Sequence, residues 1–183
     1  MAFTLETARL TLREFTLDDA AYMLRQLNEP SFIENIADRG VRTLAQAETY
    51  LENGPMRSYR THGFGFWAVT ETGSGKTLGM CGLVKRDSLA EADLGYAFLP
   101  EYFGQGFAFE ACIGCVSAAA NAFKLPRLMA IVNPENTASR RLLEKLGFNW
   151  VSMQTLTPGE AELCLYLRDL SSMRNQSAQS QIS

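Results

Sequence analysis

The sequence predicts a single α/β domain in which helices flank one mixed β-sheet. Segments that alternate between apolar and polar residues, as half-buried strands do, are interleaved with segments in which apolar residues recur every three to four positions, as in amphipathic helices. Their order along the chain, βααβββαβαββ, contains seven strands and four helices. At two points, behind the glycines of residues 104–106 and at Asn133, a helix begins directly after a strand.

Composition limits the class of protein. The chain has 183 residues, of which 46% are hydrophobic and 20% are charged, and its formal net charge is −3. It is long enough to bury a core without disulfides, and its net acidity argues against nucleic acid as the main partner. The sequence shows neither an apolar run of about 18 residues nor a signal peptide, so no membrane association is expected. Its four cysteines lie scattered in apolar segments, which predicts free thiols and a cytoplasmic location.

The first third of the chain predicts one strand and three helical pieces. Residues 9–15 alternate as a strand does, and residues 20–27 carry helical periodicity. A short helical or irregular piece is expected over residues 31–37. The next helix, over residues 43–56, begins at Thr43, whose side chain is a good N-cap.

Two strands are expected over residues 63–70 and 78–84, with the glycine-rich residues 73–77 between them. These end in Gly-Lys-Thr, the last part of a phosphate-binding P-loop, so a nucleotide-binding protein is an alternative reading. However, the opening glycine of that motif would fall on Thr70, and a strand follows where the P-loop needs a helix. A flexible hairpin turn is the better prediction.

The strand expected over residues 93–99 ends before Pro100, and residues 104–106, Gly-Gln-Gly, then open a helix that runs to about residue 124. The first turn of a helix exposes backbone N–H groups without intrahelical partners, together with the positive end of the helix dipole. Glycine allows an anion to approach these groups closely. The junction is therefore a candidate phosphate site, although it lacks the three-glycine spacing of a dinucleotide fold.

Cys112 and Cys115 form a C-x-x-C pattern inside this helix. Redox pairs sit at a helix N-terminus, where the dipole lowers the thiol pKa, and these residues lie more than one turn inside. A zinc site needs about four ligands, and the chain has a single histidine. We therefore expect the pair to pack in the core and expect no metal site.

The last third predicts a buried strand over residues 127–132, and a helix over residues 133–146 with Asn133 as its cap. Two closing strands are expected over residues 148–154 and 162–168. The polar residues 169–183 are expected to form a disordered tail.

Three segments together resemble the GCN5-related N-acetyltransferase (GNAT) superfamily, and more closely its RimJ/RimL-type branch, which acts on protein N-termini and small amines. Residues 7–15, Thr-Ala-Arg-Leu-Thr-Leu-Arg-Glu-Phe, are similar to the opening strand of that branch. Residues 94–111 are similar to its central strand, pyrophosphate loop and following helix. Residues 133–148 contain its Asn-x-x-Asn-x-x-Ser helix followed by Leu-Gly-Phe. The resemblance spans residues 7–168, which would form one acetyltransferase domain.

The resemblance implies a mostly antiparallel sheet in which the strands at 93–99 and 127–132 splay apart and admit the pantetheine arm of acetyl-CoA. Backbone N–H groups of residues 103–108 would hold the pyrophosphate, and an N–H near Phe98 or Leu99 would hold the thioester oxygen. The residues expected to bind acetyl-CoA are Phe98, Leu99, Phe103, Gly104, Gln105, Gly106, Phe107, Ala108, Asn133 and Asn136. One position departs from the family: Glu101 stands where Gln or Arg is common, and its charge would repel the pyrophosphate unless it turns away.

The resemblance also implies that an amine attacks the thioester directly. Ser139 matches the family position that protonates the leaving thiolate, and Asp93 is a candidate base, acting through water. The acceptor is either a protein N-terminus or a small amine, bound near residues 31–42 and 155–161. A catalytically inactive acyl-CoA-binding sensor is the alternative. The sequence leaves the oligomeric state open, a homodimer included.

Overall fold

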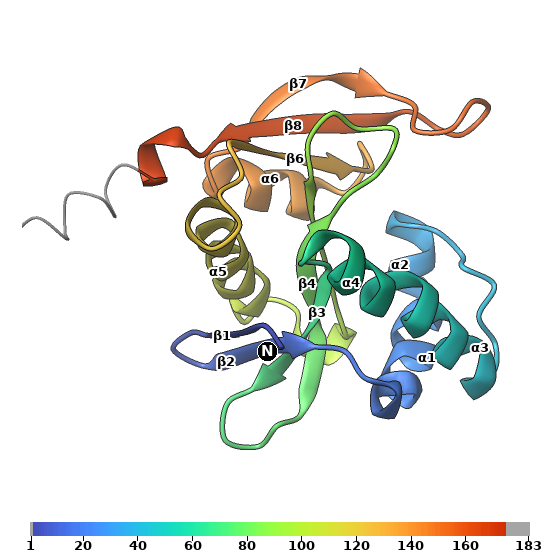
Figure 1. The fold of residues 1–183 in the computed structure, drawn as a ribbon. Coiled ribbons are helices and arrows are strands. Elements are labelled where there is room, and N and C mark those ends of the chain that lie inside the picture. Colours follow the sequence, from blue (N-terminus) through green and yellow to red (C-terminus); the bar gives the residue numbers. More distant parts are fainter. Residues whose placement is uncertain (1, 175–183) are drawn as a thin grey trace, which may run out of the picture.

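The computed structural model describes residues 2–174 of the chain. These residues form an eight-stranded sheet of order β1-β2-β3-β4-β5-β6-β8-β7 (Figure 1). Every neighbouring pair is antiparallel except β5 and β6, which run parallel. The strands are β1 (Thr4–Glu6), β2 (Leu10–Glu14), β3 (Phe66–Glu71), β4 (Thr77–Val84), β5 (Asp93–Phe98), β6 (Arg127–Val132), β7 (Asn149–Gln154) and β8 (Leu163–Asp169).

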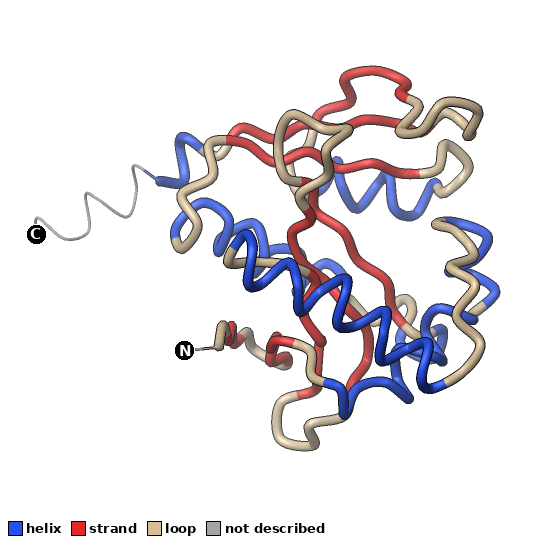
Figure 2. The backbone as a smooth tube through the Cα atoms, turned by 45° about the vertical axis from the view of Figure 1, so that its right-hand side comes forward, coloured by secondary structure: helices blue, strands red, loops and turns tan. Residues whose placement is uncertain are grey.

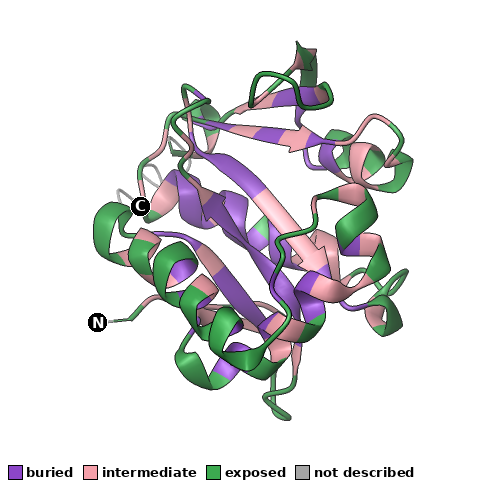
Figure 3. Ribbon diagram, turned by 90° about the vertical axis from the view of Figure 1, so that its right-hand side faces the viewer, coloured by how far each residue is buried: buried purple, intermediate pink, exposed green. Residues whose placement is uncertain are grey.

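Helices cover both faces of this sheet, as Figures 1 and 2 show. The helices α5 and α6 pack on one face, and the helices α1 to α3 pack on the other. Tyr59 of α4 packs against the cluster that contains α5. Buried residues follow the central strands, and exposed residues lie mainly on the outer sides of helices and in loops (Figure 3). The helices are α1 (Ala20–Asn28), α2 (Pro30–Asn35), α3 (Leu44–Leu51), α4 (Arg57–His62), α5 (Phe107–Asn121) and α6 (Thr137–Lys145).

The α/β class and the mostly antiparallel sheet are confirmed, but the expected seven strands are one too few. The additional strand, β1, has three residues and pairs with β2 from Thr4↔Arg13 to Glu6↔Thr11. The helix predicted over residues 43–56 ends at Leu51 and continues through a wide π-helical turn that contains Pro55. Proline has no N–H for the ordinary helical hydrogen bond, which accounts for the change of geometry at this point. The chain then forms α4, which the sequence analysis missed.

The glycine-rich residues 73–77 form the turn between β3 and β4, as predicted. Gly73 and Gly75 have φ angles of 94° and 70°, a backbone conformation that favours glycine. Strand β4 begins at Thr77, so no helix N-terminus is available to hold a phosphate at this place. The nucleotide-binding alternative therefore loses its structural basis.

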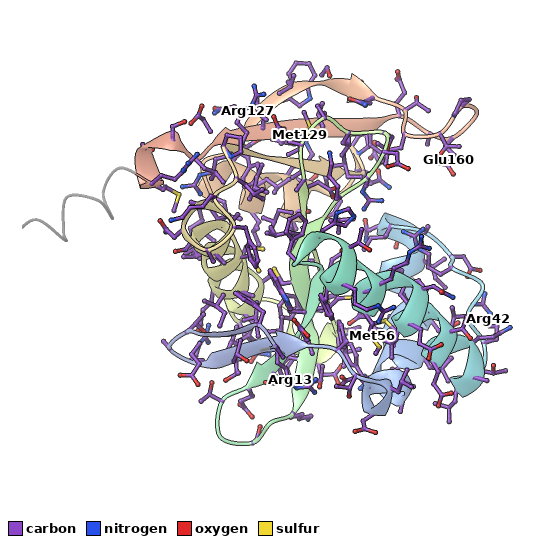
Figure 4. The ribbon with its side chains drawn as sticks, viewed as in Figure 1. Arg13, Arg42, Met56, Arg127, Met129 and Glu160 are labelled. Carbon is purple, nitrogen blue, oxygen red and sulfur yellow. The ribbon has the colours of Figure 1, made fainter. Side chains whose placement is uncertain are left out.

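Strands β5 and β6 diverge almost from the point at which they meet, which confirms the predicted splay. Within the described residues, their register contains one pair, Asp93↔Met129, and the Met129 N–H donates to the Ala92 carbonyl at 2.9 Å. Met129 lies on β6 (Figure 4). Beyond this pair, the backbone edge of β5 is left without a neighbouring strand.

The described chain ends in a short helical turn over residues 171–174. Leu170 is fully buried and Met173 packs against the core, so both contribute to the domain. The rest of the predicted disordered tail, residues 175–183, lies outside the described residues. No helix in the described part of the chain has both the length and the apolar character needed to cross a membrane.

Candidate active site

The two helix N-termini singled out in the sequence lie at the same edge of the sheet. Strands β5 and β6 are parallel neighbours, so the chain leaves both of them at the same edge, toward α5 and α6 respectively. The helices also touch each other, because the Lys145 ammonium lies 4.2 Å from the centre of the Phe109 ring. The edge therefore brings a glycine loop, two helix starts and the gap between two strands into one region.

The loop after β5 forms a short 3-10 turn at Pro100–Tyr102 and then reaches α5 through Gly104 and Gly106. These glycines have φ angles of 70° and 81°, in the left-handed region. A Cβ at Gly104 would meet no heavy atom within 4 Å, so backbone conformation rather than crowding requires glycine there. Gly106 is the N-cap of α5, and the next backbone N–H groups, including those of Phe107 and Ala108, belong to the open first turn. Phe103 and Gln105 lie in the exposed part of the loop.

Arg9 and Glu110 fasten this loop to the sheet. The Arg9 guanidinium pairs with the Glu110 carboxylate at 2.7 Å and donates to the Gln105 carbonyl at 3.1 Å. It also lies over the Phe107 ring, 4.3 Å from its centre. Glu110 accepts two more hydrogen bonds, from the Thr7 hydroxyl at 2.6 Å and the Arg9 N–H at 2.8 Å. The opening segment therefore supports the glycine loop directly.

Glu110 gives the domain a predictable response to acid. Its burial raises the pKa of the carboxyl, but the hydrogen bonds from Thr7 and Arg9 outweigh burial, and the net pKa is lowered. Such a group stabilises the fold above its unfolded pKa of about 4.3, and this contribution is lost as the pH falls through the lower folded pKa. We expect Glu110→Gln to lower the free energy of unfolding at pH 7, by a margin that shrinks below about pH 4.3. Urea unfolding of both proteins between pH 3 and 7 measures this difference in the free energy of unfolding.

Glu160 offers a matched control for this prediction, because it is exposed at the outer turn between β7 and β8 (Figure 4). Glu160→Gln should leave the stability close to that of the wild type at every pH. A Glu110→Gln deficit that stays constant down to pH 3 would contradict the account.

Glu101, the departure from the family pattern, points its carboxylate toward α1. It pairs with the Arg25 guanidinium at 2.9 Å, and Arg25 also reaches Glu29 at 3.2 Å. The Gln105 side chain donates to the Glu101 carbonyl at 2.8 Å, which closes the loop on itself. The negative charge is therefore paired with a cation outside the cradle of N–H groups.

We expect Arg25→Met to weaken acetyl-CoA binding about threefold, because it leaves the Glu101 charge unpaired beside the loop. The double variant Arg25→Met, Glu101→Gln should restore the wild-type affinity. Arg42→Met, which breaks an exposed ion pair with Asp38 on another part of the surface (Figure 4), is the control. Calorimetric titration measures all three variants, and an unchanged affinity in Arg25→Met would show that Glu101 does not act on the cofactor site.

The gap between β5 and β6 is lined by the backbone edge of β5. The Leu99 N–H was one of two groups expected to hold the thioester oxygen. It donates instead to the Leu78 carbonyl at 3.0 Å and is not free to do so. Because hydrogen-bonded pairs alternate along an antiparallel ladder, the residues two and four positions earlier also face β4. The backbone groups of Phe98 and Tyr96 point the other way, into the gap. Phe98 is therefore the remaining candidate for holding the thioester oxygen.

Ser139 lies in the first turn of α6 and meets Tyr96 across this gap. The two hydroxyl oxygens are 2.5 Å apart, and the Tyr96 hydroxyl also lies 3.3 Å from the Ser139 carbonyl. The prediction of Asn133 as the cap of this helix is wrong: α6 begins at Thr137, and the Asn136 side chain caps it by accepting from the Ser139 N–H at 3.1 Å. The Asn133 side chain accepts from the Glu135 N–H at 3.0 Å, in the turn before the helix. Both carboxamide oxygens thus hold the local backbone, and the amide NH2 groups are the donors suited to a ligand.

Tyr96 is a site residue that was not among those expected from the sequence. Strand alternation places Tyr96 on the same face as Leu94 and Phe98, toward α5 and α6, and that was the available signal. Burial is the main cause that raises the pKa of its hydroxyl. Tyr96 therefore keeps its proton at neutral pH and can donate it to Ser139.

Asp93 lies apart from this pair. Alternation along β5 places its side chain on the opposite face of the sheet, where α1 to α3 pack. It is buried and pairs with the Arg86 guanidinium at 2.9 Å. Burial raises the pKa of Asp93, and Arg86 opposes that rise. The structure thus does not bring Asp93 and Ser139 together, and the role of Asp93 as a base stays a prediction.

The C-x-x-C pair packs in the core, as predicted. Cys112 and Cys115 are fully buried on α5 and contact Cys81 of β4, with sulfur–sulfur distances of 3.7 Å and 3.4 Å. Burial raises the pKa of both helix thiols well above the ordinary value. Among residues 2–174, no group of three or more His, Cys, Asp or Glu side chains could hold a metal ion.

Comparison with known proteins agrees with this geometry. The acetyltransferase (GNAT) domain family matches residues 9–149. The uncharacterized protein YkkB of Bacillus subtilis is 28% identical over 149 residues, which cover 80% of this chain and 85% of YkkB. The uncharacterized N-acetyltransferase YoaA of Bacillus subtilis is 29% identical over 148 residues, covering 79% of this chain and 81% of YoaA.

Among solved structures, the fold is similar to RimL, a ribosomal L7/L12 alpha-N-protein acetyltransferase determined in complex with coenzyme A. The TM-score is 0.76, and the match covers 91% of this chain and 98% of RimL. Sequence identity is 12%, so this comparison establishes a shared fold only.

Proposed function

The chain belongs to the acetyltransferase (GNAT) domain family, and from this premise we propose that it transfers an acetyl group from acetyl-CoA to a primary amine. The observation that carries the proposal is the arrangement at one edge of the sheet. An open helix N-terminus behind two left-handed glycines lies next to a strand gap, and a Ser–Tyr hydroxyl pair spans that gap.

The donor substrate would use three features of the site. Backbone N–H groups of residues 104–108, supported by the dipole of α5, would bind its pyrophosphate. The Phe103 N–H, which was also expected to bind it, donates to the Pro100 carbonyl at 3.1 Å. Backbone groups of Tyr96 would hydrogen-bond the pantetheine arm, as a neighbouring strand would in a continuous sheet. The NH2 groups of Asn133 and Asn136 would donate to it from the start of α6. RimL, which shares the fold, binds coenzyme A.

The proposed chemistry is a direct attack of the amine nitrogen on the thioester carbon. The Phe98 N–H would stabilise the negative charge that develops on the carbonyl oxygen. As the carbon–sulfur bond breaks, the Ser139 hydroxyl would give its proton to the leaving thiolate, and the Tyr96 hydroxyl would replace that proton. The proton that the attacking nitrogen releases would return to Tyr96 through water, which restores both hydroxyls. An α-amine with a pKa near 8 loses its own proton with modest help, for which Asp93 is the candidate base, through water.

A protein N-terminal α-amine is the acceptor that we propose first, because RimL is an alpha-N-protein acetyltransferase with the same fold. A small primary amine is the alternative acceptor within the same reaction. In either case we place the acceptor beside residues 31–42 and 155–161.

The test is release of free coenzyme A thiol from acetyl-CoA, measured with a panel of N-terminal peptides, with small amines and without acceptor. The proposal predicts that one acceptor class raises the rate at least tenfold above the acceptor-free rate. Mass spectrometry should then find one added acetyl group on the acceptor nitrogen. Binding of acetyl-CoA without turnover on any acceptor would favour an inactive acyl-CoA sensor instead.

A further inference from the structure

Gln26 is a fully buried amide that the proposed chemistry does not yet use. It lies on α1, and its Nε2 donates to the backbone carbonyl of Phe98 at 3.4 Å. Its Oε1 accepts a hydrogen bond from the Tyr22 hydroxyl, also on α1, at 3.0 Å. A chain of two hydrogen bonds therefore connects the helix to the end of β5.

The Phe98 carbonyl needs such a partner because of the splay. In a continuous sheet, the next strand would satisfy a carbonyl that points away from β4. Here β6 has diverged, and a buried carbonyl without a partner would cost free energy. Gln26 takes the place of the missing strand at this one position, while the N–H of the same residue faces the gap on the same edge of β5.

We propose that Gln26 is a positioning residue, which fixes the end of β5 so that the Phe98 N–H is aimed at the thioester oxygen. This inference rests on the proposed function, since it concerns the same site. In a β-strand, the N–H and C=O of one residue point to the same side, so a bond that holds the carbonyl also sets the direction of the N–H. Tyr22 in turn fixes the orientation of the carboxamide.

The neighbouring residue on α1 supports this assignment. Arg25 pairs with Glu101 in the loop that follows β5, at 2.9 Å. Two adjacent side chains of α1 thus hold two successive parts of the site, the buried strand end and the exposed loop. Their roles should separate in kinetics, because Gln26 acts where the oxyanion forms and Arg25 acts where the cofactor phosphates bind.

Two variants of Gln26 and one of Tyr22 test the proposal. Gln26→Met keeps the length of the side chain and removes the donor, and we expect kcat to fall about tenfold. The Kd for acetyl-CoA should change by less than about twofold, because the phosphate cradle is intact. Tyr22→Phe should show the same pattern with a smaller loss. A change confined to stability, with kcat and Kd as in the wild type, would overturn the proposal.

Gln26→Glu adds a readout that a purely structural role would not move. A protonated carboxyl can donate to the Phe98 carbonyl, whereas a carboxylate cannot. The activity of this variant relative to the wild type at the same pH should therefore rise as the pH falls. A ratio that is flat or that falls toward low pH would contradict the proposal.

A measurement that does not depend on turnover separates this inference from the proposed function. The 13C signal of a labelled Phe98 carbonyl reports its hydrogen bond, and we expect it to shift between the wild type and Gln26→Met. An unchanged signal overturns the inference even if the enzyme is active. Conversely, a wild type that releases no thiol with any acceptor removes the proposed function, while a shifted signal would still establish the contact.

Discussion

Replacing Ser139 by alanine is expected to lower kcat about a hundredfold at neutral pH, with little change in the Kd for acetyl-CoA. The Ser139 hydroxyl contacts Tyr96 across the gap and does not hold the fold together elsewhere. Its removal leaves the departing thiolate without a proton donor. Because a thiolate needs no proton above the pKa of its thiol, the deficit should narrow above about pH 8.5. Steady-state kinetics of the wild type and of Ser139→Ala from pH 6 to 10 measure this loss of kcat.

Tyr96→Phe should reproduce part of this effect, because it removes the group that returns the proton to Ser139. Tyr166→Phe is the control: Tyr166 is fully buried whereas Tyr96 is partly buried, and the Tyr166 hydroxyl contacts Arg140 and Glu144 of α6 instead of Ser139. It should change stability but leave kcat and its pH profile as in the wild type. A Ser139→Ala variant with wild-type kcat at every pH would remove the proton-donor assignment.

Gly106→Ala is expected to weaken acetyl-CoA binding at least tenfold. At a φ of 81°, a residue with a Cβ is strained by about 1–2 kcal/mol, so the first turn of α5 should relax away from its present geometry. The new Cβ would also lie 3.4 Å from the Arg9 guanidinium, which supports the loop. The N–H groups that are proposed to hold the pyrophosphate would then no longer converge. Isothermal titration with acetyl-CoA gives the Kd.

Gly159→Ala controls for the strain itself. Gly159 has a φ of 87° in the turn between β7 and β8, and a Cβ there would meet nothing within 4 Å. Both variants should lose a similar amount of stability, but only Gly106→Ala should lose affinity. Equal affinities in the two variants would mean that the glycine loop does not hold the cofactor.

The sequence predicted the long elements because their periodicity follows from burial. The bounds of strand β6 and helix α5 could be predicted to within a few residues. A short apolar run indicates the buried strand, and apolar residues at helical spacing indicate the buried face of the helix. Strand β1 could not be found in this way, because it has three residues and exists through its pairing with β2. The same holds for α4, which follows a proline that normally ends a helix.

The candidate site was predictable where a local motif carries the geometry. The glycines at 104 and 106 are examples, because turn chemistry acts over a few residues. The start of α6 is not: Asn133 was the predicted cap, but the helix begins at Thr137 with Asn136 as its N-cap. Contacts between distant segments were not predictable. The commitment of the Leu99 N–H to Leu78 depends on strand register, and the pairing of Glu101 with Arg25 joins residues far apart in the chain. The contact between Tyr96 and Ser139 was missed for the same reason, since Tyr96 lies on β5 and Ser139 lies on α6.

The central claim is that the open N-terminus of α5 and the gap beside β5 form an acetyl-CoA site. Calorimetric titration of the purified protein with acetyl-CoA tests it most directly, with ATP as a control anion. The account predicts micromolar binding of one acetyl-CoA per chain and no comparable binding of ATP. Absence of acetyl-CoA binding, or equal binding of ATP, would contradict it.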